Sequence, residues 1–148
     1  MKTKAAMAIK AVIDTNVFVS SLSSRSEYHW LISNLINEQF NLYITTDIFL
    51  EYEEILTLKY SATVAGYFLA ALKELPNVFF VQVYFQWNLL DDPDDNKFVD
   101  CYIAAGANYL ITHDRDFNKL AFVGFPAVNI IGLPAFKNLL QLSGNEYT

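Results

Sequence analysis

Segments with strand-like and helix-like hydrophobic patterns alternate along this chain, and that alternation constrains its fold more than any other feature. Short apolar runs predict strands at 9–13, 42–45, 78–84, 109–112 and 127–131. Apolar residues at helical spacing predict helices between and after them, at about 27–38, 46–58, 61–75, 95–105 and 134–142. Strands joined through helices are normally parallel and linked by right-handed crossovers. The sequence therefore predicts an α/β protein with three layers, α/β/α, around a central, mainly parallel sheet.

The bulk composition fits one globular domain. The chain has 148 residues, of which 53% are hydrophobic, so residues 1–148 can form a single domain with a core from about 9 to 142. No apolar run approaches the ~20 residues of a bilayer-spanning helix, so no membrane association is expected. Lys10 interrupts the short apolar stretch near the N-terminus, which argues against a signal peptide. The single Cys101 cannot form an internal disulfide, and a reducing cytoplasm fits best.

Acidic residues outnumber basic ones in this sequence. The 16 Asp and Glu residues against 10 Lys and Arg give a net charge of −6. A protein that binds nucleic acid through bulk electrostatics is normally basic, so that class is disfavoured. An enzyme that meets phosphate groups through bound metal ions remains compatible with this charge.

The acids are also unevenly distributed. Seven of them lie between Asp91 and Asp116, and Asp14 directly follows the first predicted strand. Ionised carboxylates crowded in this way repel one another unless protons, cations or water relieve the repulsion. Mg²⁺ and Mn²⁺ prefer oxygen ligands, and Mg²⁺ often binds through one or two carboxylates. If these acids converge in the fold, a divalent cation is the natural relief.

The predicted topology brings several acids toward one edge of the sheet. Asp14 and Asp114 stand just past the ends of two strands, and Glu51 lies in the first turns of the helix after a third. Asp95 opens the helix that leads to the strand before Asp114, and its place is less fixed by the topology. Ligands of parallel α/β sheets bind beyond the carboxyl ends of the strands. We therefore expect three of these acids to share one edge of the sheet, where Asp95 joins them.

Four short motifs follow one another along the chain: 12–17 (VIDTNV), 51–56 (EYEEIL), 92–97 (DPDDNK) and 110–117 (LITHDRDF). In their order and spacing the chain resembles the PIN-domain ribonucleases, particularly the PIN-family toxins of prokaryotic toxin–antitoxin pairs. The resemblance covers roughly residues 9–136. It implies that the three-layer fold is a PIN-like domain.

The resemblance implies a metal-dependent endoribonuclease, a hydrolase that cleaves RNA phosphodiester bonds with a water activated by Mg²⁺ or Mn²⁺, with one or two ions bound. Four acids of the motifs would form one pocket as catalytic residues, namely Asp14, Glu51, Asp95 and Asp114, and the implied metal ligands are Asp14, Asp95, Asp114 and Asp116. Hydrogen-bonding side chains beside them would support the pocket: Thr15, Asn16 and Thr112. The implied partners are an RNA substrate, a small antitoxin protein and a second copy of the chain in a homodimer.

Basic residues near the pocket could contact substrate phosphate. Arg25, Lys97, Arg115 and Lys119 are the nearest in sequence, and we expect Lys97 or Arg115 to make this contact.

Two of the acid assignments have close competitors. Glu54 lies about one helical turn from Glu51 and shares its face, and Asp94 is the neighbour of Asp95. Asp14 could instead serve only as the N-cap of a helix that opens at Thr15.

Other polar residues in and beside the motifs are interpreted as having no direct catalytic role. Asp91, Asp92 and Asp94 are typical of a solvated turn around Pro93, and Asp100 is expected on an exposed helix face. The family often has a small residue such as Gly at the position of His113, so His113 is a departure that could narrow the entrance.

Aromatic residues are frequent, with 2 Trp, 9 Tyr and 12 Phe. The runs 84–87 (YFQW) and 28–30 (YHW) could stack on RNA bases. Core packing or a subunit interface accounts better for most of these rings.

Two other classes of function stay open. A non-catalytic PIN-like module could bind RNA or a protein without cleaving it, and RNA cleavage that is lost in Asp14→Asn would exclude this class. A phosphatase of the haloacid-dehalogenase kind also begins with an apolar strand that ends in Asp. That enzyme needs a second Asp two residues later, where this chain has Asn16.

Overall fold

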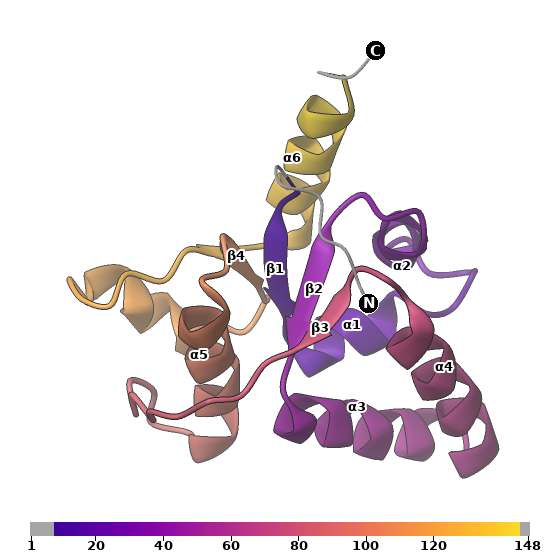
Figure 1. The fold of residues 1–148 in the computed structure, drawn as a ribbon, viewed down its shortest axis with the longest axis horizontal. Coiled ribbons are helices and arrows are strands. Elements are labelled where there is room, and N and C mark those ends of the chain that lie inside the picture. Colours follow the sequence, from indigo (N-terminus) through magenta and orange to yellow (C-terminus); the bar gives the residue numbers. More distant parts are fainter. Residues whose placement is uncertain (1–7, 146–148) are drawn as a thin grey trace.

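The first apolar run of the sequence forms the central strand of the fold. In the computed structural model, which describes residues 8–145, β1 (Lys10–Ile13) is the middle strand of a five-stranded sheet with the order β3-β2-β1-β4-β5 (Figure 1). Each neighbouring pair of strands is parallel. Ala11, Val12 and Ile13 have no exposed surface, as expected for a strand that is covered on both faces.

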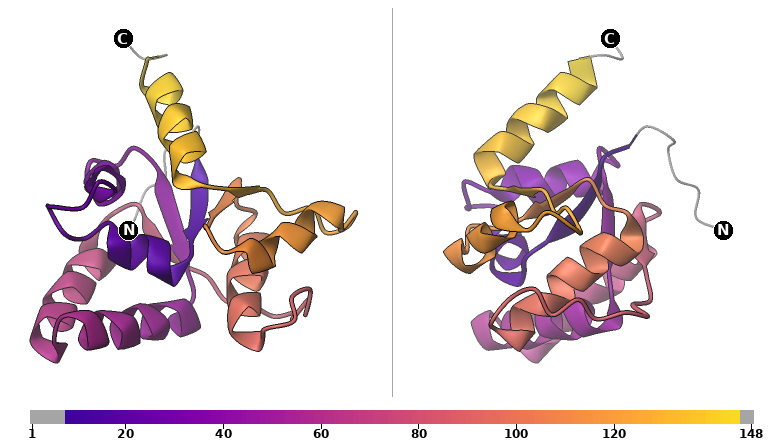
Figure 2. Two further views of the ribbon diagram at one scale, coloured as in Figure 1. Left: turned by 180° about the vertical axis from the view of Figure 1, so that it is seen from behind. Right: turned by 90° about the vertical axis from the view of Figure 1, so that its left-hand side faces the viewer.

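Helices cover both faces of the sheet, and the predicted three-layer α/β/α fold is confirmed. The other strands are β2 (Asn41–Ile44), β3 (Val78–Phe80), β4 (Tyr109–Ile111) and β5 (Ile130–Ile131). The helices are α1 (Thr15–Ser20), α2 (His29–Ile36), α3 (Thr46–Lys59), α4 (Ala62–Glu74), α5 (Pro93–Ala105), the 3₁₀ helix η1 (Arg115–Phe122) and α6 (Leu133–Asn145). Because the crossovers are right-handed, α1 to α4 lie on one side of the strands and α5 on the other (Figures 1 and 2).

Local sequence signals set the ends of the helices. The Thr45 and Ser61 side chains accept hydrogen bonds from backbone N–H groups in the first turns of α3 and α4. Asp92 caps α5 in the same way, and Pro93 occupies the first turn, where no backbone donor is needed. Gly106 ends α5 with a φ of 62°, a left-handed conformation that glycine adopts without strain.

One buried tyrosine fixes α3 against the central strand. The hydroxyl of Tyr52 donates a hydrogen bond of 2.6 Å to the carbonyl of Ile13, the last residue of β1. Its ring stacks on Phe18 of α1 with 4.2 Å between the centroids. Tyr52 is fully buried, so these contacts place the neighbouring Glu51 beside the carboxyl end of β1.

The third strand is shorter than the sequence predicted. The alternating pattern predicted a strand at 78–84, but β3 ends at Phe80. The N–H of Val81 makes a last ladder bond of 2.9 Å to the carbonyl of Ile44. The segment 81–90 then leaves the sheet and crosses toward the start of α5 (Figure 1).

Two buried polar side chains of α5 hold this segment in place. The amide of Asn96 accepts a hydrogen bond of 2.8 Å from the N–H of Leu90 and donates one of 3.1 Å to its carbonyl. One carboxylate oxygen of Asp100 accepts a hydrogen bond of 3.0 Å from the N–H of Trp87. The backbone of 81–90 therefore finds partners on α5 that compete with continued strand pairing.

The last predicted strand is also shortened. Only Ile130–Ile131 of the predicted 127–131 pair with β4, and η1 forms where the sequence predicted no element. Within residues 8–145, none of the helices combines the length and apolar character needed to cross a membrane.

Candidate active site

Adjacent parallel strands bring two of the predicted acids together. Asp14 follows β1 and Asp114 follows β4 by a few residues, and these two strands are paired. The backbone N–H of Asp14 donates a hydrogen bond of 3.0 Å to the carbonyl of Ile111, the last residue of β4. The two strand ends are thus tied to each other where the acids emerge.

A single hydroxyl links the two acids. The side chain of Thr112 donates a hydrogen bond of 2.8 Å to Oδ2 of Asp14 and accepts one of 3.0 Å from the backbone N–H of Asp114. Thr112 is buried, so this oxygen is shielded from competing water. Because its proton is directed at Asp14, the hydroxyl favours the ionised form of that carboxylate.

Three carboxylates form a cluster beside this link, which we call the acidic cluster: Asp95, Asp114 and Asp116. One oxygen from each lies within 4.8 Å of the others. Asp114 caps η1, and its side chain accepts a hydrogen bond of 2.9 Å from the N–H of Asp116, which places both acids in one turn. Asp95 comes from the first turn of α5, on a separate part of the chain.

The acids perturb one another. The pKa of Asp95 is raised to about 6, first by partial burial and then by the negative charges of Asp92, Asp114, Asp14 and Asp116. The pKa of Asp14 is also raised, mainly by burial, although hydrogen bonds from Thr112 and Thr15 act in the opposite direction. In the part of the chain whose side chains are described, neither ion pair involves a member of the acidic cluster. The charge of the cluster is therefore not neutralised by a lysine or arginine.

This donor set fits a divalent cation. Hard cations such as Mg²⁺ and Mn²⁺ take oxygen ligands, and the acidic cluster offers three carboxylates close enough to share one ion. Asp14 feels the charge of Asp114 but lies outside the group within 4.8 Å. It could complete the coordination directly or through a water molecule.

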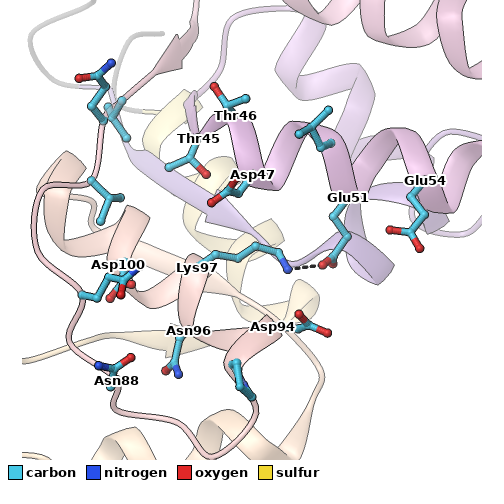
Figure 3. A pocket seen from close by; sticks show the side chains of 16 residues that line it. Thr45, Thr46, Asp47, Glu51, Glu54, Asn88, Asp94, Asn96, Lys97 and Asp100 are labelled. Atoms are coloured by element: carbon cyan, nitrogen blue, oxygen red, sulfur yellow. Dashed lines mark ion pairs between the residues drawn. The ribbon is translucent and has the colours of Figure 1, made fainter.

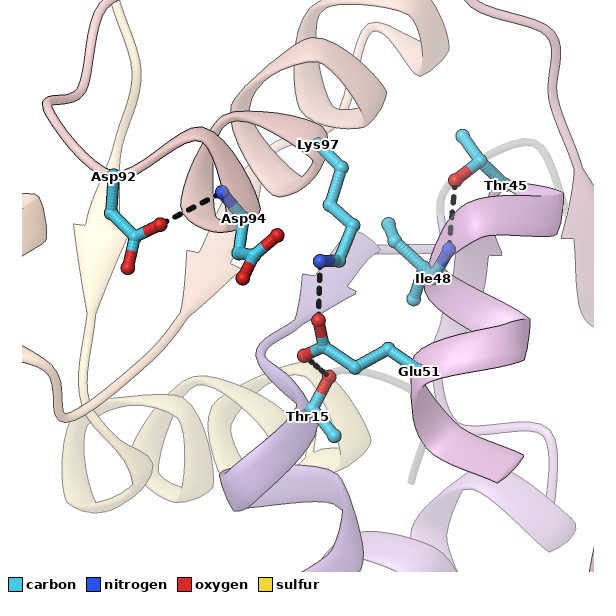
Figure 4. Close-up of polar contacts among 7 residues, drawn as sticks. All are labelled: Thr15, Thr45, Ile48, Glu51, Asp92, Asp94 and Lys97. Atoms are coloured by element: carbon cyan, nitrogen blue, oxygen red, sulfur yellow. Dashed lines mark hydrogen bonds and ion pairs between the residues drawn. The ribbon is translucent and has the colours of Figure 1, made fainter. Parts of the chain in front are cut away.

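The fourth predicted acid, Glu51, has different surroundings. One of its carboxylate oxygens accepts a hydrogen bond of 2.5 Å from the hydroxyl of Thr15, and the other forms an ion pair with Nζ of Lys97 (Figure 4). Glu51 comes from α3 and Lys97 from α5, so the pair bridges helices on opposite sides of the sheet edge.

Two hollows open on either side of the first turn of α5. The smaller, of about 330 Å³, borders the acidic cluster and is lined by Leu90, Asp91, Asp92, Asp95, Arg115, Asp116 and Lys119. The larger, of about 700 Å³, lies between α3, α5 and the segment 81–90, and its wall includes the Glu51–Lys97 pair (Figure 3). The acidic cluster and Glu51 thus face different hollows.

The sequence matches the PIN domain family over residues 10–116, which is most of the chain. The chain belongs to the PIN-domain family. No curated protein matches the sequence. Membership of this family sets the haloacid-dehalogenase alternative aside.

Solved structures support the same fold at low sequence identity. VapBC2 from Rickettsia felis bound to a DNA fragment from its promoter matches with a TM-score of 0.59 at 12% identity, covering 84% of this chain and 98% of that chain. DNA-bound VapBC from Salmonella typhimurium matches with a TM-score of 0.56 at 13% identity and the same coverage. The PIN domain endonuclease Utp24 matches with a TM-score of 0.51 at 15% identity, covering 84% of both chains. The fold is that of the PIN-domain nucleases, and the chain resembles PIN-family toxins of toxin–antitoxin systems.

The acids that the sequence offered as competitors of Asp95 and Glu51 lie away from the acidic cluster. Asp94 and Glu54 are exposed and line the larger hollow, away from the acidic cluster. Asp92 caps α5 through the N–H of Asp94, and Asp91 is exposed and pairs with Lys119 at 2.9 Å. The geometry therefore favours Asp95 over its neighbours at the cluster.

The supporting residues divide into two kinds. Thr15 and Thr112 hydrogen bond to Glu51 and Asp14, as described above. The Asn16 side chain is exposed, and among the described residues it makes no hydrogen bond to an acid of the site. Asp14 occupies the N-cap position of α1, but its side chain makes no capping hydrogen bond, so capping does not account for it.

The predicted exposure of Asp100 was wrong, and the structural roles of Asn96 and His113 were not predicted. Asp100 was expected to be exposed but is 6% exposed, because the segment 81–90 covers this face of α5, and burial raises its pKa. Asn96 was not singled out, although its two hydrogen bonds to Leu90 shape the edge of both hollows. The ring of His113 accepts a hydrogen bond of 3.1 Å from the N–H of Leu133 and so anchors α6. For Asn96 and Asp100, the only signal in the sequence was that two polar residues lie one helical turn apart on α5.

Proposed function

We propose that this protein is a metal-dependent endoribonuclease and the toxin of a toxin–antitoxin pair. The observation that carries the proposal is the convergence of Asp95, Asp114 and Asp116 within 4.8 Å at the carboxyl edge of the sheet of a PIN domain. Three carboxylates that no lysine or arginine of the described residues neutralises are suited to a divalent cation rather than to structural ion pairing.

The proposed metal ligands are Asp14, Asp95, Asp114 and Asp116, holding one or two Mg²⁺ or Mn²⁺ ions. Such an ion would supply an activated water and would stabilise charge on the reacting phosphate. The hydroxyl of Thr112 orients Asp14 and favours its ionised form against the effect of burial, since it donates to Oδ2. Asp116 is held by Asp114, whose carboxylate accepts its backbone N–H.

Glu51 has a proposed catalytic role from the neighbouring, larger hollow, together with Asp14, Asp95 and Asp114. Thr15 and Lys97 hold its two oxygens, so its position is defined before substrate binds. Lys97 can exchange this carboxylate for a substrate phosphate, and Arg115 can contact phosphate from the smaller hollow. Asn16, being exposed beside Thr15, would contact substrate rather than the acids.

The partner proposal rests on the solved structures. Two of the similar structures are VapBC complexes bound to DNA. By analogy with them, we include a small antitoxin in the proposal. Its position over the acidic site and a homodimer of the toxin are further parts of the proposal that rest on the resemblance of the sequence to PIN-family toxins.

A metal titration followed by RNA cleavage tests the function. Wild type should bind Mn²⁺ by calorimetry and cut a mixed RNA pool, and Asp14→Asn should lose both properties because the amide supplies no negative charge. Glu53→Gln, an exposed neighbour of the site on α3, is the matched control and should behave as wild type. Metal-loaded wild type that binds RNA but cuts none of it would favour the non-catalytic alternative.

A further inference from the structure

Three aromatic side chains from separate parts of the chain meet at the surface. We call them the aromatic cluster: Phe85, Trp87 and Phe125. The ring centroids are 4.7 Å apart for Phe85 and Trp87, and 5.9 Å apart for Trp87 and Phe125, and both pairs pack edge to face. Phe85 is 63% exposed and Phe125 is 81% exposed. Contiguous exposed apolar groups of this kind are candidates for an interaction site.

The aromatic cluster is fixed in position relative to the acidic cluster. The buried carboxylate of Asp100 holds the backbone N–H of Trp87 at 3.0 Å, and Asp100 lies on the same helix as Asp95. The segment that carries Phe85 and Trp87 and the segment after η1 reach the same side of the molecule, next to α5 (Figures 1 and 2). Binding at the aromatic cluster would therefore occur at a set distance from the metal ligands.

Two cations lie beside the acidic cluster and precede Phe125 along the chain. η1 begins next to Asp114 and carries Arg115 and Lys119 before the chain reaches Phe125. Both basic residues line the smaller hollow together with Asp95. The partner of Lys119, Asp91, is almost fully exposed, and an exposed ion pair of this kind is weak enough to exchange for a phosphate.

We propose that the aromatic cluster is a stacking platform for unpaired bases of an RNA strand whose backbone passes Arg115 and Lys119 to the acidic cluster. This inference rests on the proposed ribonuclease function and adds to it a base-binding subsite outside the acidic cluster. Aromatic rings stack on any unpaired base, whereas bases inside a duplex are already stacked on each other. The smaller hollow brings two cations that can bind phosphate, Arg115 and Lys119, next to acids of the site, and the exposed rings would add contacts to bases.

Trp87 itself offers a direct measurement. The chain has two tryptophans, so Trp30→Phe leaves Trp87 as the sole reporter. With Ca²⁺ in place of Mg²⁺ or Mn²⁺, titration of a single-stranded RNA oligonucleotide should quench its fluorescence to saturation. The same sequence in a duplex should bind at least several-fold more weakly.

Substitutions of the rings test the platform by binding and cleavage. Trp87→Leu and Phe125→Leu should each raise the Kd for single-stranded RNA on the order of tenfold, as expected for the loss of one stacked base. Trp87→Phe keeps an aromatic face and should retain most of the binding. Tyr67→Leu, a ring that is 75% exposed on α4, is the matched control and should bind as wild type.

The outcomes separate this inference from the function on which it rests. If wild type cleaves RNA and Asp14→Asn does not, while both leucine variants bind and cleave as wild type, the platform is overturned and the nuclease stands. If RNA quenches Trp87 but no variant or wild type cleaves, the platform stands as an RNA-binding surface and the catalytic proposal fails. If the leucine variants instead change the sedimentation mass with RNA binding unaltered, the rings form a protein interface and the platform is overturned.

Discussion

The candidate catalytic acids in the two hollows beside α5 have opposite surroundings. In the larger one, Glu51 meets a cation from the protein itself, since Lys97 pairs with it. In the smaller one, Asp95 stands next to Asp114 and Asp116, and the members of this acidic cluster form no ion pair within the described part of the chain. The same helix supplies Lys97 to one hollow and Asp95 to the other.

This difference shows where a cation from solution can act. A carboxylate already paired with a lysine gains little from a metal ion, whereas crowded carboxylates gain relief from it, and the raised pKa of Asp95 reflects this crowding. Under the proposed function, the acidic cluster is therefore the part of the site that would depend on metal, and Glu51 is the part that is organised without it.

The largest expected effect is the difference between a substitution in the acidic cluster, at Asp95, and the same substitution at the next acid, Asp94. Asp95→Asn should weaken Mn²⁺ binding and RNA cleavage more than about 100-fold, since even residues that only support metal ligands cost 10–100-fold. Asp94→Asn removes an equal charge one residue away, on the wall of the other hollow, and should change either quantity only slightly. Calorimetry and a cleavage assay measure both. Equal losses in the two variants would mean that the two hollows do not differ in this way.

The pH dependence of metal binding tests the acidic cluster next. The pKa of Asp95 is about 6, so protons compete with the metal once the pH falls below that value. Between pH 7 and pH 5 the affinity for Mn²⁺ should fall about tenfold, because the carboxylate of Asp95 becomes mostly protonated over this range. Isothermal titrations at a series of pH values measure this slope. A flat profile between pH 5 and 7 would argue against Asp95 as a ligand.

A substitution in the larger hollow should change the free energy of unfolding rather than the affinity for metal. Lys97→Met leaves Glu51 without its cation in a half-buried place and should lower the free energy of unfolding by roughly 1–2 kcal/mol, between the values for exposed and buried pairs. Lys119→Met breaks the exposed pair with Asp91 and should cost less than about 1 kcal/mol. Urea denaturation compares the two variants. A greater loss in Lys119→Met would reverse the expected order.

The smallest effect concerns the metal-free protein. Burial and like charges raise the pKa of Asp95 from its ordinary 3.8, so the folded state binds this proton more tightly than the unfolded state. Stability should therefore fall as the pH rises from about 4 to 6. In EDTA at pH 7, Asp95→Asn should be more stable than wild type, by less than about 1 kcal/mol for a partly exposed charge. Thermal melts at pH 4 should show no such gain, and unfolding of the variant at pH 7 would indicate a structural role.

Residues that directly follow a strand were the easiest to predict. Asp14 and Asp114 emerge from paired parallel strands, and the topology alone places them at one edge of the sheet. The register of the helices is less constrained by local sequence. Asp95 was placed through its motif, whereas the pairing of Glu51 with Lys97 depends on how α3 packs against α5, which no local pattern encodes.

Contacts made by irregular chain were not predictable. The residues 81–84 alternate like a strand, and only the partners on α5 explain why the sheet ends earlier. The same contacts bury Asp100, which has the charge of a surface residue and lies on a helix whose exposed and buried faces depend on that segment. Local patterns describe an element well, but they do not show what will cover it.

The bond between Thr112 and Asp14 joins residues that are 98 positions apart in the sequence. Asp14 leaves the ribosome early, yet its partners on β4 and η1 are synthesised only when most of the chain has been made. A nascent chain therefore carries no assembled acidic site until residues 111–116 have emerged. Under the proposed function, a nascent chain that has not yet exposed β4 and the start of η1 cannot cleave RNA, including the message that encodes it.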